Sequence, residues 1–453
     1  MLKRSLVLIF SLFFLLTLFT SSVFAGELQT TLLNKLQQPG QSLTRAEFVS
    51  MLVQAAELPA PTWPVSLPLD VPAGAWYAND MKTALVAGVI SRTPKNTISP
   101  DLPVTQAQAA VMLSRVLGLP GVESPGPLPS PVPNSHWAFV PFTWLVKEGI
   151  VDPTVKPDAF LTPAEGAALL DKVFGTAKEA KEIMEKSQAT QAVIKTMRGT
   201  GDMSMSMKAN PAVPVQGLPA YIGMKAKVNY EMNLDQGLHQ QFTMTMAGLP
   251  QTIPPMEVEQ YMVAEGMFMK IKDPMTSKVT WIKMPEGSVP NFMELMKQQS
   301  KFMQLPREFD KYFHYRLLGE KKVGEKTFFE LSFFGNIPNL AQFMNMVGAQ
   351  SGLNQQMIKS FEQSGSMIRG INMVGKILIN KENLYAEQLN ATAVIVFADK
   401  FEGKPFPLKS LTANFNFLYK DYGTKIDIQL PAEAAKTQGL PMTQPGTTPV
   451  KTN

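Results

Sequence analysis

The stretch Leu43-Thr44-Arg45-Ala46-Glu47 decides how the first part of this chain folds. A threonine followed three residues later by a glutamate is a capping box, in which both side chains bond to free backbone N–H groups at the start of a helix. The residues from Val49 to Ala56 then place apolar side chains at helical spacing. The stretch therefore predicts a capped, amphipathic helix that begins directly after Thr44.

The same element recurs twice, as Val104-Thr105-Gln106-Ala107-Gln108 and as Leu161-Thr162-Pro163-Ala164-Glu165. A tryptophan followed by a glycine recurs with it, at the same spacing in both copies: Trp76 and Gly88, then Trp137 and Gly149. Self-similarity at a fixed period indicates a repeated supersecondary unit. The first part of the chain is therefore predicted to be helical and built from repeats.

In this order, the elements resemble the S-layer homology motif, over residues 26–176 with a proline-rich insertion at 120–133. The resemblance implies an α-helical pseudo-trimer that binds secondary cell-wall polysaccharide in the grooves between its motifs. Matching position by position gives the candidate binding residues Arg45, Glu47, Trp76, Gly88 and Trp137. The arginine of the first box is replaced by Gln106 and Pro163 in the other two, which puts polymer binding there in doubt. Helix capping and core packing are the alternative roles for all of these residues.

The chain begins with the pattern of a secretory signal peptide. Lys3 and Arg4 precede the apolar run 6–19, and small residues precede a cut after Ala25. A retained membrane anchor is the alternative, but the apolar run is short for a membrane span. The chain has no cysteine, so it has no lipidated cysteine and no disulfide. We therefore predict a signal peptide at 1–25 and a secreted, S-layer-associated protein of the cell wall, with no transmembrane segment after cleavage.

Composition argues against several classes of protein. The 453 residues are 45% hydrophobic and 17% charged, enough for two or three packed domains. Three scattered histidines and no cysteine argue against a metal cluster or a histidine-based triad. A net charge of +5 is small for this length and indicates no nucleic-acid partner. We predict no catalytic residues, no metal, no cofactor and no enzymatic activity.

After a charged helical linker at 177–191, the pattern changes to alternation of apolar and polar residues. Such alternation predicts half-buried antiparallel strands. We expect an α+β domain over residues 192–431, with a large curved antiparallel sheet, or open half-barrel. Helices at 291–304, 340–347 and 354–364 are expected to pack in or over its concave face. The tail at 432–453 is predicted to be disordered.

Methionine is the unusual residue of this second part of the chain, which holds most of the 28 methionines. Thioether side chains suit surfaces that accept apolar partners of variable shape. We predict a hydrophobic-ligand cavity lined by Met203, Met205, Met207, Met232, Met244, Met246, Met267, Met269 and Trp281. Ordinary core packing is one alternative, and copper(I) held by thioethers is another.

Residues 192–431 also resemble Gram-positive surface lipoproteins of the LolA and LppX half-barrel type. The resemblance is carried by the methionine strands, Glu259-Gln260-Tyr261, Trp281-Ile282-Lys283-Met284 and Leu318-Gly319-Glu320. It implies a curved sheet around helices, with a cavity for a lipid-like ligand. The resulting hypothesis is a wall-attached surface protein that binds or senses an apolar ligand. The alternative is a structural or interaction protein with a solid-cored sheet and no small ligand.

Overall fold

The structure is a computed structural model of the whole chain. It describes residues 27–36, 40–61, 63–118, 132–210, 213, 219–248, 254–272, 276–284, 312–337, 340, 343, 367–398, 400–401 and 404–437. Three predicted features lie wholly or mostly outside these residues. They are the signal peptide, the proline-rich insertion and the three helices expected in or over the concave face.

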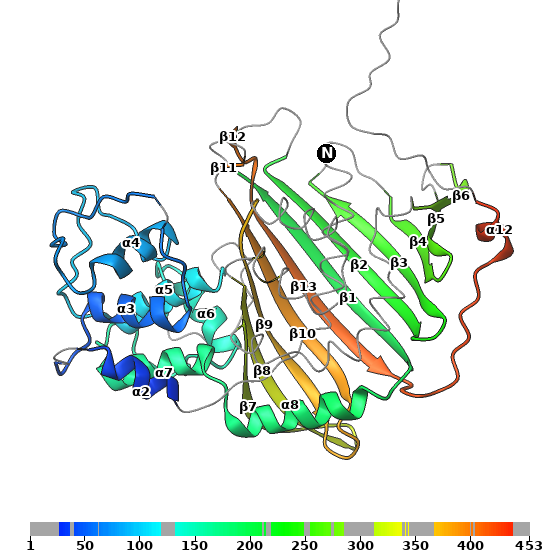
Figure 1. The fold of residues 1–453 in the computed structure, drawn as a ribbon, viewed down its shortest axis with the longest axis horizontal. Helices are drawn as coiled ribbons and strands as arrows, with labels where there is room; N and C mark the ends of the chain where they lie inside the picture. Colours follow the sequence, from blue (N-terminus) through cyan, green and yellow to red (C-terminus); the bar gives the residue numbers. More distant parts are fainter. Residues whose placement is uncertain are drawn as a thin grey trace, which may run out of the picture.

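The first part of the chain is a bundle of helices, seen in blue to green in Figure 1. They are α2 (Glu27–Asn34), α3 (Arg45–Ala55), α4 (Ala78–Val86), α5 (Gln106–Val116), α6 (Phe139–Lys147) and α7 (Pro163–Phe174). Each of the three boxes forms the predicted capping box, so α3, α5 and α7 begin directly after Thr44, Thr105 and Thr162. All six helices contribute to one apolar core.

Backbone hydrogen bonds join the three boxes in a closed ring. The N–H of Leu43 donates to the carbonyl of Leu161 over 2.6 Å, and that of Val104 donates to Leu43 over 2.9 Å. The N–H of Leu161 donates to Val104 over 3.0 Å and closes the ring. The residue before each cap thus has the same hydrogen-bonding role in all three copies. The pseudo-trimer itself stays a prediction.

The second part is one 11-stranded antiparallel sheet with a separate two-stranded ribbon. The strands are β1 (Thr196–Ala209), β2 (Tyr221–Asn233), β3 (Gly237–Ala247), β4 (Met256–Val263), β5 (Gly266–Lys272), β6 (Val279–Lys283), β7 (Phe313–Val323), β8 (Lys326–Ile337), β9 (Ile368–Asn380), β10 (Ala386–Phe397), β11 (Lys400–Phe401), β12 (Lys404–Pro405) and β13 (Leu408–Lys420). Their order is β6-β5-β4-β3-β2-β1-β13-β10-β9-β8-β7, with β11 and β12 in the ribbon. The first strand therefore pairs with the last, and the predicted large antiparallel sheet is confirmed.

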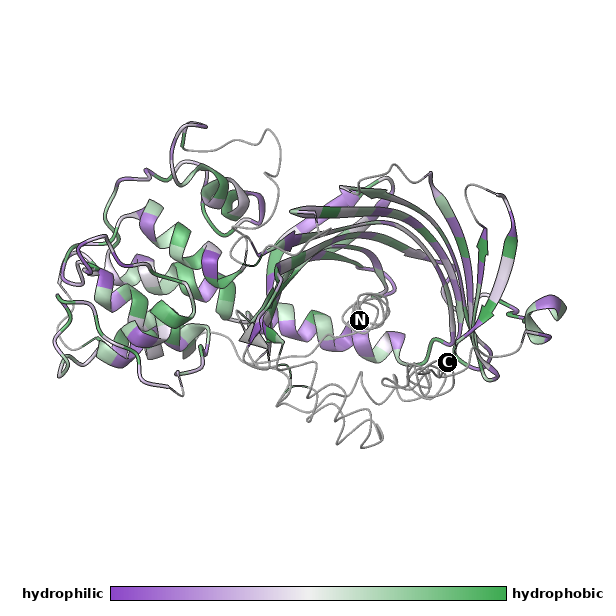
Figure 2. Cartoon of the chain, turned by 90° about the horizontal axis from the view of Figure 1, so that it is seen from above, coloured by the Kyte–Doolittle hydropathy of each residue, from purple (hydrophilic) through white to green (hydrophobic). Residues whose placement is uncertain are grey.

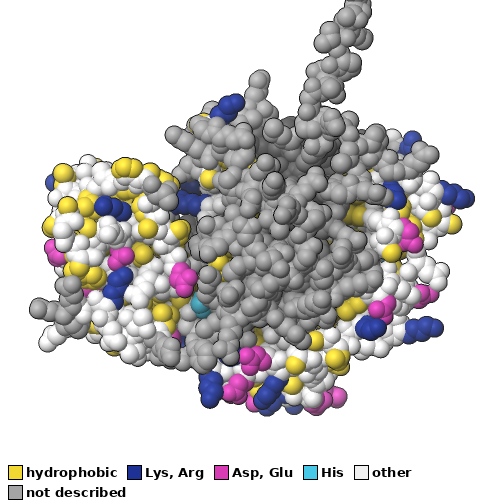
Figure 3. Space-filling model, in the orientation of Figure 1, with side chains coloured by type: hydrophobic (Ala, Val, Ile, Leu, Met, Phe, Trp, Pro, Cys, Tyr) yellow, Lys and Arg dark blue, Asp and Glu magenta, His cyan; other side chains and the backbone are white. Residues whose placement is uncertain are grey.

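The sheet curves into an arch, and helix α8 (Lys178–Gln191) lies beneath its concave side (Figure 2). Ala180, Ile183 and Met184 of α8 are buried in the same apolar cluster as one face of the sheet. The charged residues of α8 face outward along the lower edge of Figure 3. Residues 177–191 are thus helical as predicted, but α8 packs on the sheet and does not behave as a separate linker.

The helical bundle packs against the convex face of the sheet. Phe334 in β8 and Val374 in β9 are paired and belong to the apolar core of the bundle. Their neighbours Phe333 and Met373 belong to the concave cluster instead, as expected because successive strand residues point to opposite faces. The two parts of the chain therefore share a core across the outer face of β8 and β9.

Polar contacts border this junction. The Asn336 amide donates to the Ala56 carbonyl (2.8 Å), the Tyr315 N–H donates to Thr176 Oγ1 (3.2 Å), and Arg316 lies 3.6 Å from Asp171. The two groups in each contact come from different parts of the chain, so these contacts fix the position of the helical bundle on the sheet.

After β13, the chain crosses the convex face of the opposite end of the sheet. Ile426, Ile428 and Ala434 pack with Tyr261 and Phe268. Ala434 belongs to helix α12 (Ala432–Ala435), so the tail predicted to be disordered from residue 432 begins with a packed helix. The apolar contact of Ala434 is the physical reason for that correction. Within the part of the chain that the structure describes, no helix is long and apolar enough to cross a membrane.

Candidate functional site

The methionines predicted to line a cavity share the concave face of the sheet. In β1 to β3, Met205 pairs with Met224, which pairs with Met246. Paired residues share a face, and alternate residues of one strand share it too. The methionines on this face are Met197, Met203, Met205, Met207, Met224, Met232, Met244, Met246, Met256, Met262, Met267, Met269 and Met373.

Burial divides these methionines into two groups. Met203, Met205, Met224 and Met232 are less than one tenth exposed, and Met205 is 5% exposed. Met207, Met244, Met246, Met267 and Met269 are half-buried. The first group packs as a core, whereas the second, which apart from Met207 belongs to β3 and β5, retains partial solvent contact.

Trp281 does not belong to this methionine face. Met269 pairs with Ile282, so the adjacent Trp281 points to the convex side. There it packs against Tyr261, with ring centroids 6.1 Å apart, and lies under the Lys270 ammonium at 5.7 Å. Its inclusion among the cavity residues was wrong, because register fixes the face of a strand residue.

The convex face of β1 to β5 carries a chain of charge contacts beside this apolar cluster. His239 lies between Glu231 at 3.5 Å and Glu259 at 3.1 Å. Arg198 bonds to Glu231 over 2.7 Å and Lys270 bonds to Glu259 over 3.1 Å. Hydrogen bonding to Arg198 lowers the pKa of Glu231. Arg198 and Lys270 each pair with a carboxylate on the neighbouring strand, and cross-strand pairs of opposite charge stabilise a sheet.

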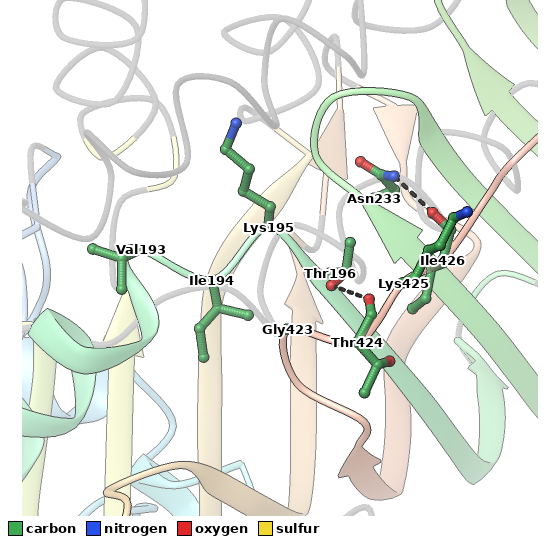
Figure 4. Close-up of a pocket in the computed structure, with 9 residues that line it drawn as sticks. All are labelled: Val193, Ile194, Lys195, Thr196, Asn233, Gly423, Thr424, Lys425 and Ile426. Atoms are coloured by element: carbon green, nitrogen blue, oxygen red, sulfur yellow. Dashed lines mark hydrogen bonds between the residues drawn. The ribbon is translucent and has the colours of Figure 1, made fainter.

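A pocket of about 440 Å³ lies where the chain after β13 crosses the ends of β1 and β2 (Figure 4). The Thr196 hydroxyl donates to the Thr424 carbonyl over 2.6 Å, and the Asn233 amide donates to the Ile426 carbonyl over 2.8 Å. Thr196 and Asn233 alternate with Met197 and Met232, so this pocket is not on the methionine face.

In the helical bundle, two of the candidate polymer-binding residues have structural roles. The Glu47 carboxylate is 8% exposed and accepts from the Thr44 N–H over 2.7 Å, as the capping box requires. Gly88 has φ +71°, a conformation that favours glycine, and it ends α4. Their part in polymer binding stays a prediction.

Arg45 interacts electrostatically with two other charged residues, Arg115 and Asp70. Burial, then the Arg115 guanidinium, lower the pKa of Arg45, and Asp70 opposes them. The Arg45 Nε is buried and has no hydrogen-bond partner among the residues that the structure describes. Asp70 accepts backbone N–H groups from Ile98 and Ser99. Asp70 and Arg115 were not among the candidate polymer-binding residues predicted from the sequence.

The two repeated tryptophans are on the surface. Trp76 is 37% exposed and packs edge-on against Tyr77, with ring centroids 5.5 Å apart. Trp137 is 62% exposed and lies beside His136. A further tryptophan, Trp63, is 58% exposed and was not selected by the repeat. None of these three rings fills the core, so core packing does not explain them.

The described residues contain no group of three or more His, Asp or Glu side chains arranged to hold a metal ion. The described residues thus form a bundle of helical repeats with exposed tryptophan rings and an arched sheet whose concave face is rich in methionine.

The chain belongs to a family described as "Family of unknown function (DUF6612)", whose profile matches residues 179–438. The profile of the S-layer homology domain matches residues 69–110, which confirms the first resemblance for that segment. No curated protein matches the chain.

Several solved structures are similar to the second part of the chain. LprF from Mycobacterium bovis is 11% identical, with a TM-score of 0.30, over 57% of this chain and 99% of that chain. The lipoprotein LppX from Mycobacterium tuberculosis is 9% identical, with a TM-score of 0.26, over 55% and 97%. A DUF1329 family protein from Desulfovibrio piger is 10% identical, with a TM-score of 0.19, over 56% and 96%.

Proposed function

We propose that this protein is exported and attached non-covalently to secondary cell-wall polysaccharide by its helical bundle. The S-layer homology match at 69–110 supports the attachment. The exposed Trp76 and Trp137 rings suit stacking on sugars, and the Arg45 guanidinium suits an anionic polymer. Export would be directed by residues 1–25.

Attachment is tested with the full chain and isolated cell walls. The protein should sediment with walls that carry the secondary polymer and stay in solution with walls from which that polymer has been chemically removed. Equal sedimentation with both preparations, or with neither, would contradict the attachment.

We further propose that the arched sheet binds or senses a hydrophobic, lipid-like ligand on its concave face. The observation that carries this proposal is the set of methionines on one face, several of them half-buried between β3 and β5. Flexible, polarisable side chains adapt to apolar ligands of variable shape. Such a protein would deliver or detect lipids at the cell surface.

A solid-cored scaffold is the second candidate, and the tight burial of Met203, Met205 and Met224 favours it. Native mass spectrometry and lipid extraction of protein purified from its host separate the two candidates. Co-purified lipid supports the ligand-binding role, whereas protein that is empty and that takes up no added lipid supports the scaffold. The absence of enzymatic activity stays a prediction from the sequence.

A further inference from the structure

Three polar side chains meet where β8 and the end of β9 lie next to the start of β10. The Lys326 ammonium donates to Glu387 Oε2 over 2.7 Å, and the Asn380 amide donates to Glu387 Oε1 over 2.8 Å. Phe328 pairs with Asn380, so Lys326, two residues before Phe328, is on the same face of the sheet as Asn380. One carboxylate therefore contacts a lysine and a carboxamide from two neighbouring strands.

The Asn380 side chain is fixed from both sides. Its Oδ1 accepts from the Glu382 N–H over 2.9 Å, so its nitrogen is the atom that faces Glu387. The residue is 2% exposed, and its backbone N–H donates to the Tyr385 carbonyl over 2.9 Å. A backbone N–H that contacts a carbonyl oxygen stabilises the oxyanion that forms when a nucleophile adds to the carbonyl carbon. The contact from Glu382 thus polarises the Asn380 carboxamide for attack.

Lys326 contacts this buried group from the solvent side. The Lys326 side chain is 56% exposed, whereas that of Glu387 is 18% exposed. A neighbouring ion pair differs, because no asparagine amide in the described part of the chain contacts the Glu330 carboxylate that Lys321 contacts over 3.1 Å. The combination of lysine, carboxylate and buried asparagine is thus more than a surface ion pair, and its open side gives a leaving group a path to solvent.

We propose that Lys326 and Asn380 form an intramolecular isopeptide bond, with Glu387 as the acid–base catalyst. Glu387 takes a proton from the Lys326 ammonium, the freed electron pair forms the Nζ–Cγ bond, and the carbonyl π electrons move to Oδ1. The Glu387 carboxyl group then donates its proton to Nδ2 as the Cγ–Nδ2 bond breaks, and it takes the next proton from Nζ. Ammonia leaves, accepts that proton and departs as ammonium, so Glu387 is a carboxylate again.

The bond joins β8 to β9 in a chain that contains no cysteine. A covalent cross-link between two strands restricts the unfolded chain, as a disulfide does. The reaction needs no oxidant and no cofactor, because the nucleophile, the carboxamide and the catalyst all belong to the chain. It is also independent of any ligand of the helical bundle or of the concave face.

The test is mass spectrometry of the full chain, both intact and after digestion with trypsin. We expect the intact protein to be lighter than its sequence by one molecule of ammonia, and one digestion product to contain both Lys326 and Asn380. Glu387→Gln keeps the size of the side chain and removes the base, so cross-linking should slow by at least about 100-fold. Lys326→Arg keeps a positive charge beside Glu387 and should abolish the bond. Lys321→Arg, in the ion pair with Glu330, is the matched control and should cross-link like the unmodified chain.

Circular dichroism checks that each variant is folded, and the cross-linked chain should unfold at a higher temperature than Glu387→Gln. An intact mass equal to that of the sequence, with Lys326 and Asn380 in separate peptides, would overturn the proposal. So would a loss of ammonia without a joined peptide, because an asparagine that cyclises to a succinimide also releases ammonia. Undiminished cross-linking in folded Glu387→Gln would overturn the catalytic role of Glu387.

Discussion

The imidazole of His314 lies parallel to the ring of Phe334, with ring centroids 6.3 Å apart and planes 13° apart. Phe174 of α7 packs edge-on against both rings where the helical bundle meets the sheet. Burial lowers the pKa of His314 to about 4, because an imidazolium ion would lose its hydration in this apolar contact. The two parts of the chain are thus joined through a histidine that has to be neutral.

This histidine should make stability depend on pH in a defined window. Between its ordinary pKa of 6.5 and its folded value of about 4, His314 binds a proton in the unfolded chain but not in the folded one. Stability therefore falls as the pH decreases through that window, by roughly 3 kcal/mol, and this contribution levels off below it.

His314→Phe keeps a flat ring at this position and removes the titrating group. From about pH 7.5 to about pH 4.5, its free energy of unfolding should fall by roughly 2.5 kcal/mol less than that of the unmodified chain. Denaturant unfolding at the two pH values measures the difference, with His136→Gln, which changes a half-buried histidine of the bundle, as the control. Identical pH dependence in all three proteins would contradict the assignment.

Phe334→Ala should weaken the packing of the helical bundle against the sheet. The ring is buried in the core that the bundle shares with β8 and β9, so its removal should cost about 3 kcal/mol. Limited proteolysis should then cut more rapidly near Thr176, where the chain passes from bundle to sheet. Leu418→Ala is the matched control, because Leu418 is on the same convex face but 50% exposed. Unchanged stability and proteolysis in Phe334→Ala would show that the contact between the bundle and the sheet contributes little to the stability of the folded chain.

The sequence predicted those features that depend on local spacing. Capping boxes and alternating strands depend only on residues close together in the sequence. Free backbone N–H groups at a helix start select the residues of the capping box, and the pleat of a strand selects alternating apolar and polar residues. The junction was not predicted, because Phe334 looks like any apolar strand residue until its partner surface is known. Trp281 was assigned to the wrong face because its orientation depends on pairing with β5.

Variants of Arg45 and Glu47 should show which residue contributes to polymer binding and which to helix capping. Arg45→Gln places the residue of the second box, Gln106, in the first box. It should weaken sedimentation with cell walls about tenfold, since a charge-assisted contact is lost, with little change in stability. Glu47→Ala removes the capping carboxylate and should lower stability by about 1 kcal/mol, while the folded protein still binds walls. The reverse pattern of effects would assign the polymer contact to Glu47 instead.

Trp137→Ala should reduce wall binding without affecting folding, because the ring is 62% exposed. Trp144→Ala provides the contrast, since Trp144 is 3% exposed in the bundle core and its loss should cost about 3 kcal/mol or more. Sedimentation with walls and thermal unfolding are measured on both variants. Full wall binding by Trp137→Ala would exclude a stacking role for this ring.

Methionine oxidation should distinguish a ligand-binding face from a solid core. Peroxide converts accessible thioethers to sulfoxides, and buried ones react slowly. Met244, Met246 and Met269 are half-buried, whereas Met205 is 5% exposed. If a lipid occupies the concave face, loading the protein with diacylglycerol should protect the three half-buried methionines and leave Met205 unchanged, as peptide mass spectrometry would show. Met112, which is 3% exposed in the bundle core, reports any unfolding during the treatment. Equal oxidation of the half-buried methionines with and without lipid, while Met112 stays reduced, would favour the solid-cored scaffold, because a face that binds nothing has nothing to shield it.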